Sequence, residues 1–360
     1  MKRQFYSVIV GSGRYIPSRI IKNADFLDHV FFDTKGNKVE TPNEEIIEKF
    51  RKITEIDERR YVDDDLVTSD IGYFAAKEAL ESSGIDKESL DYIIVAHNFG
   101  DVKHENRKSD TVPSLASRIK NKLGIANPFT VVYDIAFGCP GWLQAIIQAD
   151  YYIRSGDAKK ILVIGAETLS RVSDPHDRDS MIYSDGAGAT ILEAQESPEP
   201  VGIITHLTRS DTLNHAHLLN MGTSNNPEYP DNTLFLKMEG RKLYEYALNI
   251  VPQLVKDCIE KAKLSINDIK KVLLHQANTK MDDAMLSGLF RLFGLKQSPE
   301  DIMPMTIAKF GNNSVATLPI LLDLILKGEF PQHRFSSGDH VVLASVGAGM
   351  NANALVYKIR

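Results

Sequence analysis

The feature that most constrains the fold is a repetition between the two halves of the chain. The segment IVPQLVKDCIEKAKLSINDIKKVLLHQA echoes the earlier segment IGYFAAKEALESSGIDKESLDYIIVAH. FGN at 310–312 echoes FGC at 137–139, and SGD at 337–339 echoes SGD at 155–157. Three echoes in one order, about half a chain apart, indicate an internal duplication. The copies are too long for a solenoid repeat, so we expect two similar α/β halves around a pseudo-two-fold axis.

Cys139 stands where a predicted strand meets a predicted helix. Residues 130–135 are β-branched and apolar, residues 136–138 predict a tight turn, and residues 142–153 show helical periodicity. Pro140 suits the first helical position, which places Cys139 at the helix N-cap, as in a nucleophile elbow. The positive helix end favours an anion there, so we expect a lowered thiol pKa and a nucleophilic thiolate.

A free cysteine is more often a small, buried apolar residue than a nucleophile. Cys258 fits that plain interpretation, because it lies in the amphipathic helical pattern LVKDCIEKAKL. The strand–turn–Cys–Pro–helix setting favours the nucleophile for Cys139. We also expect residues 201–207 to add a strand to the sheet of the first half, and residues 112–123 to form a helix.

Composition excludes several classes of function. The 360 residues are 43% hydrophobic and 25% charged, which is typical of a globular protein, and the net charge of −6 argues against general nucleic-acid binding. Two cysteines cannot build a disulfide framework, and no apolar run approaches the ~18 residues of a membrane span. No Cys/His spacing suggests a metal site. We therefore expect a cytoplasmic enzyme that binds neither nucleic acid nor membrane.

Two further side chains are candidates for the same site as Cys139. Asn312 is its positional counterpart in the second copy, so a pseudo-dyad would turn both elbows toward one site. His275 ends the predicted strand VLLH and precedes a predicted helix, and α/β sheets place chemistry at such carboxyl ends of parallel strands. Seven other histidines lie in loops or at loop edges: His97, His104, His176, His215, His217, His333 and His340. By itself, His275 is as well explained by a structural role.

The motifs FGCPGW, VLLHQAN and FGNNS, in this order, resemble the beta-ketoacyl-[acyl-carrier-protein] synthase III family of the thiolase-like superfamily. SDGAGATIL, DPHDRDS, LKMEGRKLYEYA and VLASVGAGMNANALV resemble it too, so the resemblance covers nearly the whole chain. It implies a thiolase-like α/β fold of two duplicated halves in five layers, α-β-α-β-α. Residues 1–200 would be the half with the nucleophilic cysteine, and residues 201–360 the half with the histidine and asparagine.

The resemblance also implies a reaction. Cys139 would accept an acyl group from acyl-CoA, and His275 and Asn312 would promote decarboxylation of malonyl-acyl carrier protein. Claisen condensation then gives a 3-oxoacyl-carrier product in fatty-acid or related biosynthesis. Neutral imidazole and amide N–H groups suit a developing enolate, and the backbone N–H groups of Cys139 and Ala348 would form a second oxyanion hole. Acyl-CoA and malonyl-carrier are the substrates, and no metal or further cofactor is expected.

Other family features predict partners. Val112 stands where the family more often has a phenylalanine that lines the partner subunit's acyl pocket, which predicts a homodimer and a longer or differently shaped starter. Lys280, Arg241 and Lys242 are candidates for docking an acidic acyl carrier protein. The family's usual tryptophan is absent from TPNEEIIEKFRK, since the only tryptophan is Trp142. This departure predicts a different contact with the coenzyme A adenine.

Several alternatives stay open from sequence. The main one is a condensing enzyme of secondary metabolism with a different starter or without decarboxylation. Head-to-head condensation needs an extra carboxylate, which is absent at Val112, although Glu105 lies in the preceding loop. A hydroxymethylglutaryl-type synthase has a different cysteine motif, and a papain-like hydrolase would share residue types only. Intact Cys139, His275 and Asn312 argue against a non-catalytic carrier-binding subunit.

Overall fold

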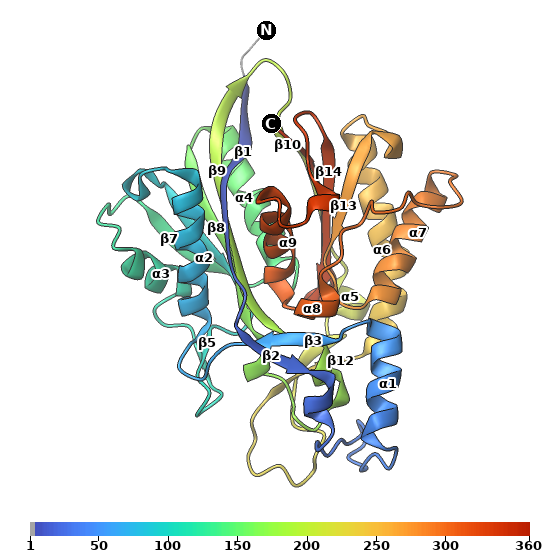
Figure 1. The fold of residues 1–360 in the computed structure, drawn as a ribbon. Coiled ribbons are helices and arrows are strands. Elements are labelled where there is room, and N and C mark those ends of the chain that lie inside the picture. Colours follow the sequence, from blue (N-terminus) through green and yellow to red (C-terminus); the bar gives the residue numbers. More distant parts are fainter. Residues whose placement is uncertain (1–3) are drawn as a thin grey trace.

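Two mixed β-sheets lie side by side, with helices between them and on both outer faces (Figure 1). The structure is a computed structural model, and it describes residues 4–360. The first sheet has the order β1-β9-β8-β4-β7, in which β4 runs parallel to β7 and β8, and β9 runs antiparallel to β8 and β1. Its strands are β1 (Gln4–Tyr15), β4 (Tyr92–Ala96), β7 (Val131–Ile135), β8 (Lys160–Thr168) and β9 (Asp185–Ser197).

The second sheet repeats the first one without β7. Its order is β10-β15-β14-β13, with one parallel pair between β13 and β14 and two antiparallel pairs. Its strands are β10 (Gly202–Ser210), β13 (Ile269–Leu274), β14 (His340–Gly347) and β15 (Asn351–Lys358). The same order and the same directions in both sheets confirm the predicted duplication.

The expectation that residues 201–207 extend the first sheet is wrong. They begin β10, which pairs with β15 in the second sheet as β1 pairs with β9 in the first. The chain crosses between the sheets at Gly202, which has a φ of +68° and packs directly against the backbone of Ser7 in β1. A side chain at Gly202 would collide with that backbone, so the crossing depends on glycine.

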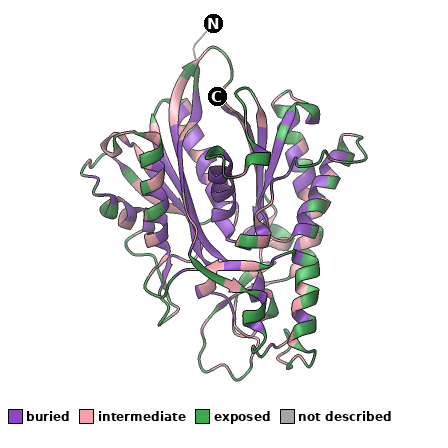
Figure 2. Cartoon of the chain, viewed as in Figure 1, coloured by how far each residue is buried: buried purple, intermediate pink, exposed green. Residues whose placement is uncertain are grey.

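Three layers of helices complete the architecture. The outer helices α2 (Thr68–Ser83) and α3 (Leu115–Leu123) cover the first sheet, and α6 (Gly240–Lys261) and α7 (Thr279–Leu292) cover the second. Between the sheets lie α4 (Gly141–Ser155) and α9 (Thr317–Leu326), which share one apolar core with strands of both sheets. Nearly all of α9 is buried, as Figure 2 shows for the centre of the molecule, because TLPILLDLIL is apolar on every face.

Shorter elements gather at one end of the two sheets (Figure 1). The helix α1 (Asn43–Thr54) is one of them. The helix expected over residues 112–123 begins only at Leu115, because Ser114 caps α3. No helix among residues 4–360 is long and apolar enough to cross a bilayer. The remaining elements are β2 (Arg19–Lys22), β3 (Glu58–Tyr61), β5 (Asp101–Val102), β6 (Ser109–Asp110), α5 (Thr212–His215), β11 (Leu219–Gly222), β12 (Phe235–Met238) and α8 (Ile307–Phe310).

One acid in this fold is buried without a matching charge. Asp282 lies in the first turn of α7 at 0% exposure, and neither carboxyl oxygen meets a hydrogen-bond partner among residues 4–360. Loss of hydration, reinforced by the charge of Asp283, raises the pKa of Asp282 well above its usual value. The folded protein therefore keeps this proton to a higher pH than the unfolded chain does.

We predict that Asp282→Asn stabilises the protein at pH 8 and changes its stability little near pH 4. A raised folded-state pKa contributes stability that is lost as pH rises above the unfolded pKa, by up to about 1.4 kcal/mol per pH unit. Urea unfolding at several pH values measures the slope, with the exposed Asp28→Asn as the control. An equal effect of Asp282→Asn at both pH values would contradict the prediction.

Candidate active site

The Cys139 turn joins β7 to the central helix α4. The turn needs Gly138, whose φ is +68°, and α4 starts at Gly141 with Pro140 as its N-cap residue. Cys139 therefore lies one residue before the N-cap, which corrects the sequence-based placement. Its side chain is partly accessible and lines a cavity.

The Cys139 turn presses against the turn that follows β14. A Cβ atom on Gly138 would lie 2.6 Å from the backbone nitrogen of Ala348, and one on Gly347 would lie 2.5 Å from the backbone nitrogen of Cys139. Such distances leave no room for side chains at either glycine. The backbone nitrogens of Cys139 and Ala348 are thus brought to the same edge of the cavity, which both residues line.

His275 lies directly after β13, and its backbone N–H donates to the carbonyl of Ala344 on β14 (2.9 Å). The residue is 4% exposed, and its Nδ1 has no hydrogen-bond partner among residues 4–360. Burial lowers the pKa of His275 to about 4. The imidazole is therefore neutral near pH 7, so one ring nitrogen carries a proton that can be donated.

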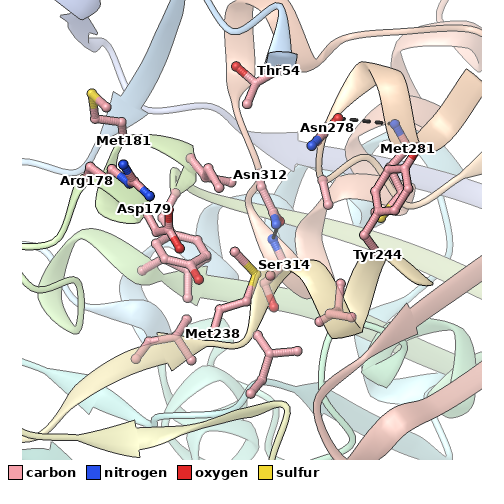
Figure 3. A pocket seen from close by; sticks show the side chains of 18 of the residues that line it. Thr54, Arg178, Asp179, Met181, Met238, Tyr244, Asn278, Met281, Asn312 and Ser314 are labelled. Atoms are coloured by element: carbon pink, nitrogen blue, oxygen red, sulfur yellow. Dashed lines mark hydrogen bonds between the residues drawn. The ribbon is translucent and has the colours of Figure 1, made fainter. Parts of the chain in front are cut away.

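Asn312 is held by its backbone and oriented through its side chain. Its N–H donates to Ile182 (2.9 Å), and its carbonyl accepts from Ser184 (2.8 Å). The side-chain oxygen accepts from the backbone N–H of Ser314 (2.9 Å), as the dashed line in Figure 3 shows. Because the oxygen is engaged in this way, the NH2 group of Asn312 is left to donate.

Cys139, His275 and Asn312 line one cavity of about 670 Å³. The structure thus brings together the three residues that the sequence singled out: Cys139 and His275 from strand ends of the two sheets, and Asn312 from the segment after α8. Around them the walls are mainly apolar, with methionine, leucine and isoleucine side chains from α1, the β11–β12 hairpin, α6 and α7. Figure 3 shows Tyr244 and Met281 on one side of Asn312, Arg178 and Asp179 on the other, and Met238 below. Such a cavity suits a ligand with a long apolar part and few polar groups.

The environment of Cys139 does not lower its thiol pKa. Burial and the nearby charge of Glu167 both raise the pKa of Cys139, and a hydrogen bond from Ser314 opposes the rise. The net pKa is about 11. The expectation of a lowered pKa is therefore wrong in direction. It took account of the helix end but not of desolvation, which depends on the tertiary fold.

Sequence reasoning missed three polar residues beside the cysteine. The Ser314 hydroxyl lies 3.6 Å from the Cys139 sulfur, and Asn98 contacts both Ser314 and the fully buried Glu167. Ser314 stands within the motif FGNNS, and Asn98 and Glu167 stand at the carboxyl ends of the parallel strands β4 and β8. Their position at these strand ends is the sequence feature that could have identified Asn98 and Glu167 as site residues.

The remaining predicted residues lie outside the cavity. Val112 is 83% exposed and does not line the cavity of its own chain. Arg241 and Lys242, at the start of α6, pair with Glu245 (3.1 Å) and Glu239 (2.5 Å). Lys280 is exposed at the start of α7, beside the cavity residue Met281, and has no partner among residues 4–360. Across that same range, no three His, Cys, Asp or Glu side chains gather as a metal site would require.

Two family models match the chain. The model of 3-oxoacyl-[acyl-carrier-protein] synthase III matches residues 133–211, and the model of its C-terminal part matches residues 259–359. Among solved structures, the beta-ketoacyl-[acyl carrier protein] synthase III of Thermus thermophilus is 30% identical, with a TM-score of 0.79 and coverage of 98% of this chain and 99% of that one. The corresponding enzyme of Aquifex aeolicus is 27% identical, with a TM-score of 0.77 and the same coverage.

The priming beta-ketosynthase of the R1128 polyketide pathway shares the fold at 24% identity, with a TM-score of 0.79 and coverage of 100% of this chain and 98% of that one. These matches over nearly the whole chain confirm the predicted thiolase-like α/β fold.

We predict that Gly138→Ala disrupts the Cys139 turn far more than Gly156→Ala disrupts the end of α4. Both glycines have positive φ, but nothing lies within 4 Å of a Cβ on Gly156. Each alanine costs about 1 kcal/mol or more for backbone strain, and the collision with Ala348 adds about 1–3 kcal/mol at Gly138. Thermal unfolding and the alkylation rate of Cys139 by iodoacetamide measure the difference. Equal destabilisation by both variants would refute the close contact.

Proposed function

Because the chain belongs to the beta-ketoacyl-[acyl-carrier-protein] synthase III family, we propose that it makes a Cys139-linked acyl-enzyme and condenses it with malonyl-acyl carrier protein. The observation that carries the proposal is the meeting of Cys139, His275 and Asn312 around one apolar cavity. The product is a 3-oxoacyl-carrier thioester with two more carbons than the starter.

In the first half-reaction, the Cys139 sulfur attacks the carbonyl carbon of an acyl-CoA starter. The thiol proton leaves as the C–S bond forms, and coenzyme A departs as its thiol. Negative charge develops on the carbonyl oxygen, where the N–H groups of Cys139 and Ala348 would donate. The contact between their two turns supports this role, because it keeps both donors in place before the substrate arrives.

In the second half-reaction, malonyl-carrier loses carbon dioxide and its thioester becomes an enolate. His275 and Asn312 each supply one N–H to the enolate oxygen, which lowers the barrier without requiring a charged group. The low pKa of His275 supports a neutral donor at pH 7. The enolate carbon then attacks the acyl-enzyme carbonyl, and the Cys139 thiolate departs and regains a proton.

Carrier docking is proposed at the basic residues close to the cavity. Lys280 supports this best, since its charge is not neutralised, whereas Arg241 and Lys242 are already paired with glutamates. To pair with Arg241 or Lys242, an acidic carrier would have to displace these glutamates, but it could pair with Lys280 without displacing another group. Association steered by such exposed charges weakens with salt.

One observation favours a second candidate, condensation without decarboxylation. That reaction needs a carboxylate base, and Asp179 lines the cavity while Glu105 does not. Burial and the neighbouring Asp177 raise the pKa of Asp179 to about 6, close to the range of a general base. This alternative releases no carbon dioxide, whereas condensation with malonyl-carrier does. A carbon dioxide assay therefore distinguishes the two reactions.

We further propose a homodimer that forms along β7. Within residues 4–360 this strand pairs with β4 alone and is an edge of the first sheet; Val131, its first residue, is 48% exposed, and Phe129 just before it is 84% exposed. An open edge with exposed apolar side chains favours pairing with another strand. Antiparallel pairing of two β7 strands about a two-fold axis would cover it and bring Val112 toward the neighbouring subunit.

Light scattering should give twice the chain mass of 40.2 kDa. Val131→Lys combined with Phe129→Asp should shift the mass toward the monomer, because charges would be buried in the pairing surface. Phe5→Lys, on the opposite edge strand, is the matched control and should remain dimeric. A monomeric and fully active native protein would overturn this assembly.

The central prediction is that the two half-reactions separate by mutation. Cys139→Ala should abolish acyl loading and still release carbon dioxide from malonyl-carrier, because the donor pair survives. Asn312→Ala should load normally but lose decarboxylation and condensation by about 10²- to 10³-fold, the usual cost of one oxyanion donor. His275→Ala should behave similarly. Acyl-enzyme mass and radiolabelled carbon dioxide measure the two steps.

Lys280→Glu is the comparison variant for this experiment. It should raise the KM for malonyl-carrier and leave loading from acyl-CoA intact. Blocked loading together with normal decarboxylation in Asn312→Ala would reverse the assigned roles. Condensation without release of carbon dioxide in the native protein would favour the second candidate.

A further inference from the structure

We propose that Asn98 is a positioning residue, which aims the Ser314 hydroxyl at the Cys139 sulfur and is itself held in register by the buried Glu167. The inference deepens the proposed function, because it concerns how the nucleophile of the same site is prepared. It rests on a continuous set of contacts that crosses from the first half of the chain to the second.

The Asn98 side chain makes three contacts in three directions. Its NH2 group donates to Glu167 Oε2 (2.7 Å) and to Ser314 Oγ (3.3 Å). Its oxygen accepts from the backbone N–H of Gly138 in the nucleophile turn (2.9 Å). Only an amide supplies two donors and one acceptor in this arrangement, since a carboxylate lacks the donors and a hydroxyl has only one.

Glu167 fixes which way the amide of Asn98 points. Its carboxyl group is fully buried at the end of β8 and accepts from both the backbone N–H and the side chain of Asn98. A carboxylate accepts and cannot donate when ionised, so the NH2 group must face it and the oxygen must face Gly138. The amide cannot flip without losing these contacts.

The orientation of Asn98 in turn determines the orientation of Ser314. Because Ser314 Oγ accepts from Asn98, its own proton is directed at Cys139 Sγ, 3.6 Å away. A donor at the sulfur stabilises the thiolate relative to the thiol. Ser314 has a positive φ of 52°, and its N–H holds the side-chain oxygen of Asn312, so one residue contacts both halves of the site.

Two groups beside Cys139 affect its thiolate in opposite directions, which gives two effects to test. Ionised Glu167 on β8 disfavours the thiolate, and Ser314 favours it. Burial raises the pKa of Glu167 to about 7, while His97, directly after β4, and Asn98 lower it and Asp185 on β9 raises it. Above pH 8, Glu167 is therefore mostly ionised, and the contribution of Ser314 can be measured against a constant charge.

The test is the second-order rate of Cys139 alkylation by iodoacetamide between pH 8 and 10, which requires no acyl transfer. Asn98→Ala and Ser314→Ala should each lower the rate about fivefold, the equivalent of one hydrogen bond. The double variant should be no slower than either single variant, because Asn98 acts through Ser314. Glu167→Gln should raise the rate, since it removes the opposing charge but keeps an acceptor for Asn98.

Asn106→Ala, in the next loop between β5 and β6, is the matched control and should leave the rate unchanged. Losses that multiply in the double variant would overturn the proposal, as would an unchanged rate in Asn98→Ala with a lowered Tm, which indicates a structural role only. Asn98→Asp, which keeps the shape but loses the donors, should be at least as slow as Asn98→Ala. Since alkylation does not depend on malonyl-carrier chemistry, these outcomes stand apart from any failure of the condensation assay.

Discussion

The contact between two glycine-lined turns is the constraint on which the site depends. Gly138 and Gly347 let the turn after β7 and the turn after β14 approach until backbone meets backbone. Each turn ends a strand of a different sheet, so this contact fixes the distance between the two halves at the point where Cys139 sits. Further along the sheets, α4 and α9 lie between them and share one apolar core with strands of both. The cavity opens where this helical spacer ends.

Burial then determines the protonation states. The same desolvation that keeps His275 neutral also raises the pKa values of Cys139 and Glu167. A neutral imidazole is what an enolate-stabilising donor requires, but a neutral thiol is a weak nucleophile. Burial therefore provides a neutral hydrogen-bond donor at His275 but reduces the thiolate fraction of Cys139. Local donors at the sulfur matter more here than in an exposed site, because low dielectric strengthens them.

The sequence predicts those parts of the structure that depend on local or repeated patterns. The two sheets and the meeting of Cys139, His275 and Asn312 follow from motifs that recur in each half. The pKa of Cys139 could not be predicted in the same way, because it depends on burial by distant segments. The contact between Asn98 and Ser314 joins residues 216 positions apart, and no periodicity in the sequence predicts it. The Pro140 motif placed the helix start correctly to within one residue, which is the usual uncertainty of helix ends.

The duplicated sheets and the segments outside them contribute different parts of the site. Cys139 and His275 follow strands of the two sheets, which pack against buried helices, and Asn312 follows α8 and is held by backbone contacts to Ile182 and Ser184. Part of the cavity wall comes from α1 and the β11–β12 hairpin, which belong to neither sheet. Changes in these walls need not disturb the strands that position the catalytic groups. Tryptophan is absent from α1, so the predicted change in the contact with the coenzyme A adenine falls on such a wall and not on the strands of the two sheets.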